Sequence, residues 1–68
     1  MNVMFQVDAF FARIQESRGR LELTVWDQAG RKIVSEYVSA ASLDHLWDSI
    51  AKQSSQEVVD QVRAKVLS

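Results

Sequence analysis

The chain has 68 residues, of which 47% are hydrophobic and 25% charged, and its formal net charge is −1. A chain of this length has room for one hydrophobic core, so we expect a single domain over residues 1–68. It contains no cysteine, which excludes disulfides, a thiolate nucleophile and Cys-ligated metals, and one histidine cannot build a multi-histidine site. We therefore expect no cofactor and no metal.

The amino-terminal stretch carries no basic region ahead of an apolar run, and Asp8 and Arg13 lie within it. This composition predicts neither a signal peptide nor a membrane span, and it favours a cytoplasmic protein. Nucleic-acid-binding modules usually carry a clear excess of Lys and Arg, which this chain lacks. Nucleic acid is therefore not the favoured partner on composition.

Residues 3–17 fit two kinds of secondary structure. Their apolar members fall at helical spacing: Val3, Val7, Phe10, Phe11 and Ile14. Arg18 and Gly19 then suit a helix end, because glycine accepts the left-handed conformation and a cation interacts well with the helix dipole. The favoured prediction is an amphipathic helix. The alternative keeps residues 4–16 extended as one strand that turns near Gly19 into the next.

Residues 20–38 predict a β-hairpin. Apolar and polar residues alternate over residues 21–26, which are rich in β-branched and aromatic types, and residues 32–38 form the returning strand. Asp27 and Gly30 are typical turn residues between them. Two registers are open: Leu23 opposite Val34, or, with a bulge, Val25 opposite Ile33 and Leu21 opposite Tyr37.

Two helices are predicted after residue 39. The first is capped by Ser39 or Ser42, and its apolar side consists of Ala40, Leu43, Leu46, Trp47 and Ile50. The second begins at Ser54 and Glu57, which have the spacing of a capping box, and it carries a stripe of valines at positions 58, 59, 62 and 66. The predicted fold is therefore α+β, with the order helix, β-hairpin, helix, helix. The alternative is a three-stranded antiparallel meander followed by two helices.

The sequence does not indicate an enzyme. His45 lies three residues before Asp48, a spacing that more often gives a hydrogen bond on the surface of a helix than a general base. The chain shows no second histidine, no activated nucleophile and no glycine-rich phosphate loop. We therefore expect a protein without catalytic activity.

Protein interaction is the predicted function. A two-stranded hairpin is not stable alone and presents unpaired edges, and the chain has more large aromatic residues than one small core needs. We expect an inhibitor or adaptor that docks on a larger protein. It would also form a homodimer, either by pairing edge strands or by burying the valine-striped helix against its copy. The residues predicted to contact partners are Trp26, Arg31, Tyr37, Asp44, Asp48, Val58, Val62 and Val66.

The alternative function is a small nucleic-acid-binding regulator. The last two helices resemble a helix-turn-helix in their order, although the joint at Gln53 and Ser54 lacks the usual glycine. The hairpin offers a second possibility, since Trp26 beside Tyr37 and nearby arginines would provide surfaces on which bases stack.

Overall fold

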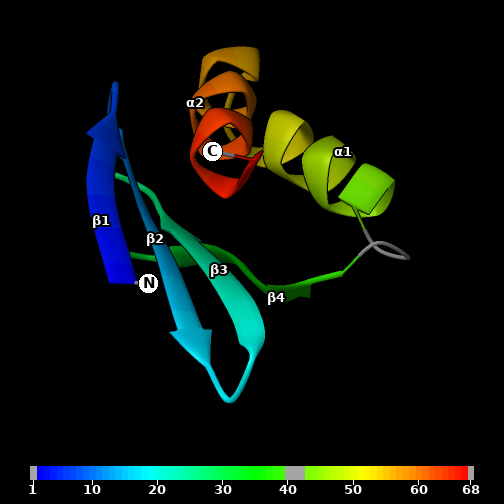
Figure 1. The fold of residues 1–68 in the computed structure, drawn as a ribbon. Coiled ribbons are helices and arrows are strands. Elements are labelled where there is room, and N and C mark those ends of the chain that lie inside the picture. Colours follow the sequence, from blue (N-terminus) through cyan, green and yellow to red (C-terminus); the bar gives the residue numbers. More distant parts are fainter. Residues whose placement is uncertain (1, 40–42, 68) are drawn as a thin grey trace.

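The computed structural model describes residues 2–39 and 43–67. In this part of the chain four strands precede two helices: β1 (Asn2–Val7), β2 (Phe10–Ser17), β3 (Arg20–Trp26), β4 (Lys32–Val38), α1 (Leu43–Gln53) and α2 (Gln56–Leu67). The strands form one antiparallel sheet in the order β1-β2-β3-β4. Both helices lie on the same side of this sheet, so the fold is an α+β structure of two layers (Figure 1).

The prediction of a helix over residues 3–17 is wrong. This segment forms a hairpin, in which Val3 lies opposite Ile14 and Val7 lies opposite Phe10. The three-stranded alternative fits only in part, because a meander does precede two helices but the sheet has four strands. The chain reverses after Val7, so residues 2–17 form two strands. The alternative prediction had treated residues 4–16 as one continuous strand.

Left-handed residues make the first two turns tight. Asp8 has a φ of 53°, and aspartate is one of the few non-glycine residues that adopt this conformation readily. Arg18 and Gly19 both have positive φ, 55° and 78°, which is the pattern of a type I′ hairpin turn. Gly19 therefore closes a hairpin and does not end a helix.

The register of β3 with β4 matches neither predicted pairing. Val25 lies opposite Val34 and Trp26 opposite Lys32, and a β-bulge between these pairs leaves Ile33 as the additional residue of β4. An additional residue on one strand changes the pairing of everything beyond it. This is why the alternation along the two strands did not determine their register.

The capping box predicted at Ser54 is also wrong. The Ser54 hydroxyl donates to the Ile50 carbonyl at 2.6 Å, so Ser54 belongs to the end of α1. The Val58 amide instead donates to the Ser55 hydroxyl at 3.3 Å, which makes Ser55 the cap of α2. Ser42, the candidate cap of α1, and Ala40 lie outside the described residues.

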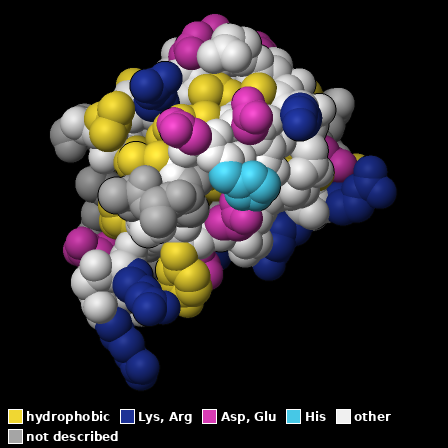
Figure 2. Space-filling view, turned by 90° about the vertical axis from the view of Figure 1, so that its right-hand side faces the viewer, with side chains coloured by type: hydrophobic (Ala, Val, Ile, Leu, Met, Phe, Trp, Pro, Cys, Tyr) yellow, Lys and Arg dark blue, Asp and Glu magenta, His cyan; other side chains and the backbone are white. Residues whose placement is uncertain are grey.

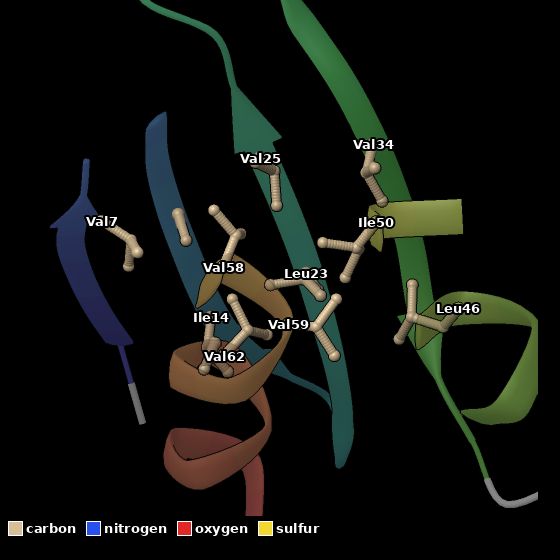
Figure 3. Packing of buried hydrophobic residues seen from close by; sticks show 11 residues of the cluster. Val7, Ile14, Leu23, Val25, Val34, Leu46, Ile50, Val58, Val59 and Val62 are labelled. Carbon is tan, nitrogen blue, oxygen red and sulfur yellow. The ribbon is translucent and has the colours of Figure 1, made fainter. Parts of the chain in front are cut away.

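The core fills the space between the sheet and the helices (Figure 3). Its buried hydrophobic residues are Val7, Ala12, Ile14, Leu23, Val25, Val34, Leu46, Ile50, Val58, Val59 and Val62. Valine is a mediocre helix former, so burial against the sheet stabilises α2 more than its own propensity does. The valines of α2 thus pack within one protomer.

Truncating Leu23, which is fully buried at the centre of β3, should lower the free energy of unfolding by about 2–5 kcal/mol, since Leu23→Ala leaves a cavity. Urea denaturation measures this loss. The matched control is Leu67→Ala at a side chain that is 66% exposed, where a change within about 0.5 kcal/mol is expected. Equal losses in the two variants would contradict the described core.

Candidate functional site

The face of the sheet opposite the helices is the most distinctive surface of the molecule. We call it the open face. The strand registers arrange its side chains in rows across the sheet. The rows are Gln6–Phe11–Trp26–Lys32, Met4–Arg13–Thr24–Ser35, Asn2–Gln15–Glu22–Tyr37 and Ser17–Arg20. Aromatic, cationic and polar side chains are therefore mixed on the open face, and no row is wholly apolar.

Two arginines of the open face stack on aromatic rings. The Arg13 guanidinium carbon lies 5.2 Å from the centroid of the Trp26 ring. The corresponding distance from Arg20 to the Tyr37 ring is 5.1 Å. Both distances are within the range of cation–π attraction, which is worth about 0.5–1 kcal/mol at exposed sites. The rings and guanidinium groups are therefore held as ordered, flat surfaces.

The first stack shields the middle of the open face. Thr24 lies beside Arg13 in the register and is 1% exposed, although it points away from both helices. The Arg13 Nε atom is itself buried and has no hydrogen-bond partner. Burying a charged donor without an acceptor is unfavourable. The contact with Trp26 is the interaction that compensates in part for this cost.

The second stack lies beside a hollow at the turn between β2 and β3. Ser17, Arg18, Arg20 and Tyr37 line this open hollow, whose volume is about 420 Å³. Tyr37 is 52% exposed, so its ring is accessible from solvent. Two guanidinium groups beside an accessible aromatic ring make this end of the open face suitable for an anion attached to a flat group.

Charge is distributed unevenly between the two layers. On the open face, Arg13, Arg20 and Lys32 stand against Glu22. The two helices carry four acidic residues, Asp44, Asp48, Glu57 and Asp60, and three basic ones, Lys52, Arg63 and Lys65. The overall charge of −1 is therefore a poor guide to the electrostatics of the open face.

The single histidine lies on the side of the molecule formed by α1 and β4, with acidic side chains around it (Figure 2). His45 is exposed, and its Nε2 atom is 4.0 Å from the Glu36 Oε1 atom, too far for a hydrogen bond that would orient a base. The other Glu36 oxygen is buried without a partner. Among the described residues no group of three His, Cys, Asp or Glu could hold a metal ion.

The predicted partner residues lie in four places. Trp26 and Tyr37 share the open face, near its two ends, and Arg31 follows the turn between β3 and β4. Asp44 and Asp48 are exposed on α1. The valines of α2 are in or against the core: Val58 and Val62 are buried, and Val66 is partly buried. The predicted set of partner residues therefore contained two aromatic residues of the open face and six residues from other parts of the molecule.

The open face also contains four residues that were not among those predicted to contact partners: Met4, Phe11, Arg13 and Arg20. A partial signal was present for β2, because apolar and polar residues alternate from Ala12 to Gln15. It was missed because the same segment also fits a helix. An assignment of β2 as a strand would have placed Phe11 and Arg13 on one face.

Arg31 is held by a local network at the turn after β3. The Asp27 carboxylate accepts hydrogen bonds from the Arg31 and Ala29 amides at 2.8 and 3.0 Å, and the Arg31 side chain lies 3.4 Å from it. The hydrogen bond from the Arg31 backbone amide is the largest cause that lowers the pKa of Asp27. The hydrogen bond from the Ala29 amide and the positive charge of Arg31 lower this pKa further, whereas partial burial of the carboxylate raises it. Arg31 therefore stabilises its own turn.

Comparison of the chain with protein-family models, with curated proteins and with solved structures finds no match. Among the described residues, no helix is long and apolar enough to cross a membrane.

Replacing Asp27 by asparagine should make stability less dependent on pH. The pKa of Asp27 in the folded chain is below its ordinary value of 3.8. The ionised carboxylate therefore stabilises the fold above that value, and this stabilisation is lost as the pH falls through the lowered pKa. Urea denaturation from neutral to acid pH should find Asp27→Asn less stable than the natural chain, by a difference that shrinks in acid. A constant difference would contradict the network.

Proposed function

We propose that the protein is a non-enzymatic module that binds single-stranded nucleic acid on the open face of its sheet. The observation that carries the proposal is the pair of arginine–aromatic stacks on a face that both helices leave uncovered. Every base has a flat π surface, and sheet-based modules bind single strands by stacking such bases on aromatic rings and guanidinium planes. The ordered rings of Trp26 and Tyr37 provide surfaces of this kind.

The spacing of the two stacks suits separate bases along one strand. Trp26 lies opposite Lys32, whereas Tyr37 lies opposite Glu22, four residues earlier on β3. At ~3.3 Å per residue along the strand and ~4.8 Å between neighbouring strands, the two positions are roughly 14 Å apart. A single base cannot reach both of them. An extended strand that runs along β3 would contact one ring near each end of the open face.

The charges of the open face suit a phosphate backbone between and beyond these bases. Arg18 and Arg20 line the hollow beside Tyr37, and Lys32 lies beside Trp26 at the other end. Arginine and lysine bind phosphate oxygens by charge-assisted hydrogen bonds. A small number of such contacts supports modest affinity that falls as salt concentration rises.

Duplex DNA fits this surface poorly. Four strands spaced by ~4.8 Å place the outer backbones roughly 14 Å apart, before their side chains are added. The major groove is about 12 Å wide. The whole sheet is therefore too broad to enter the groove, and stacking in addition requires bases that are already unpaired.

Docking on a larger protein, as an inhibitor or adaptor, is the competing use of the same face. Trp, Tyr and Arg are also the residue types enriched in protein hot spots. A hot spot, however, lies at the centre of a continuous, desolvated patch, whereas here Arg13 lies between the Phe11–Trp26 pair and the row that contains Glu22 and Tyr37. This interleaving of charged and aromatic side chains favours nucleic acid.

Tryptophan fluorescence tests the proposal directly, because the chain has two tryptophans in different places. Trp47→Phe leaves Trp26, on the open face, as the reporter. Titration of this variant with single-stranded oligo(dT) at low salt should quench the emission, and the titration should weaken as salt is added. In the matched variant Trp26→Phe, Trp47 on α1 should show no quenching. No binding of oligo(dT) or oligo(A) at low salt would refute the proposal.

Substitutions should locate the binding face. Tyr37→Ala removes an exposed ring and should weaken oligonucleotide binding by about 5- to 150-fold, the equivalent of 1–3 kcal/mol for one base stack. Arg20→Gln should weaken it in the same direction. Arg63→Gln, at an exposed position of α2, is the matched control and should leave affinity unchanged. Equal effects of Arg20→Gln and Arg63→Gln would show unspecific charge attraction instead.

A further inference from the structure

The two edges of the sheet differ in how they are protected. The β4 edge carries a β-bulge, Lys32, and Glu36, whose carboxylate points to the helix side. Bulges, lysines and inward-pointing charges are the devices by which edge strands avoid pairing with other chains. The β1 edge has the sequence NVMFQV, which contains no charged residue and no proline, and its register with β2 is continuous.

The backbone of β1 is therefore open to a further strand. β1 pairs with β2 along one side, and among the described residues no backbone–backbone hydrogen bond joins it to a turn or a helix. A strand of six residues is long enough to serve as a template for a further strand. A sheet with one edge protected against strand pairing and the other edge unprotected is expected where a further strand pairs with the unprotected edge.

We infer that β1 pairs antiparallel with β1 of a second copy of the chain, about a two-fold axis at Phe5, so that the two sheets become one. Such a contact is isologous, which is the commonest form of a homodimer interface. The inference does not depend on nucleic-acid binding, because it rests on the edge of the sheet and not on its open face.

The sequence of β1 is compatible with this symmetry. A two-fold axis perpendicular to the sheet places the helices of both copies on the same side of the joined sheet. Residues that lie opposite each other across the two β1 strands must therefore belong to the same face of the sheet. Pairing about Phe5 satisfies this condition: Phe5 lies opposite the partner's Phe5, Val3 opposite the partner's Val7, and Met4 opposite the partner's Gln6. The helix-side residues of β1 then all meet apolar side chains.

The dimer would also cover apolar surface that one protomer leaves exposed. Met4 is 63% exposed. Phe5 is only partly buried, and one side of its ring is covered by the flexible Lys65 side chain, whose ammonium lies 5.6 Å from the ring centroid. A chain of this size buries a smaller share of its unfolded surface than a larger domain does, so additional burial at the edge is a substantial gain.

Charge substitutions on the open-face side of β1 test both the interface and its register. In Met4→Glu/Gln6→Glu, carboxylates of the two copies would face each other twice, and like charges directly opposite are destabilising. Met4→Glu/Gln6→Lys changes the same two positions but makes both contacts attractive. Within the protomer position 4 lies opposite Arg13, so a carboxylate there is compatible with the fold.

Light scattering coupled to size exclusion, over a dilution series, measures the result. We expect the natural chain and Met4→Glu/Gln6→Lys to approach twice 7.7 kDa at high concentration, and Met4→Glu/Gln6→Glu to remain at 7.7 kDa with an unchanged circular dichroism spectrum. Ser35→Glu, an exposed position on the β4 edge, is the control and should still dimerise. Amide exchange should be slower in β1 of the dimer than in the double-glutamate variant.

Three outcomes would overturn the inference. The first is a natural chain that stays at 7.7 kDa at every concentration. The second is a dimer that persists in Met4→Glu/Gln6→Glu, since it would use another surface. The third is failure of Met4→Glu/Gln6→Lys to restore the dimer, which would exclude the register about Phe5. None of these outcomes bears on oligonucleotide binding, which is measured separately on the Trp47→Phe chain.

Discussion

The reversal of the chain between β1 and β2 is the constraint on which the rest of the structure depends. A two-residue turn at Asp8 makes Val7 and Phe10 partners, so the side of the chain that faces the helices changes from odd positions in β1 to even positions in β2. This places Ala12 and Ile14 in the core and turns Arg13 outward, where it stacks on Trp26. Both the core and the open face therefore follow from one tight turn, because side chains alternate strictly along a strand.

The sheet separates two kinds of surface in a chain whose overall charge is close to neutral. On one side, the helices bury the apolar residues and present acids to solvent. On the other, cations lie among aromatic rings, and the two arginine–aromatic stacks hold these groups in place. Local distribution of charge matters more than the total here, because interactions between exposed charges fade beyond about 8–10 Å in physiological salt. A ligand that approaches the open face meets Arg13 and Arg20 and is screened from the acids of the helices.

The edges of the sheet add a second level of organisation. In a small domain the loss of conformational entropy nearly balances the gain from burial, so the core between one sheet and two helices leaves little reserve. Pairing of β1 with a second copy would extend both the core layer and the open face, with the helices on the other side. The bulge and Glu36 restrict this extension to one edge, since the β4 edge is unsuitable for a regular ladder. Self-association and ligand binding would thus use different parts of the same sheet.

Periodicity located β3 and the two helices, because in those segments one period was dominant, and the turn residues Asp27 and Gly30 indicated β4 as the returning strand. It could not decide residues 3–17, whose apolar residues fit both a helical repeat and an alternation interrupted by a turn, and Asp8 is not the glycine that usually marks such a turn. Trp26 and Tyr37 were named from the sequence, but Arg13 and Arg20 joined them only once the strand register was known. The sequence by itself determined the hairpin of β3 and β4 and the helical end of the chain, but not which valines of α2 enter the core. The tertiary structure decided the fourth strand, the bulge and the open face, because these depend on which residues lie opposite each other across strands, and that pairing is set by packing between segments and not by any one of them.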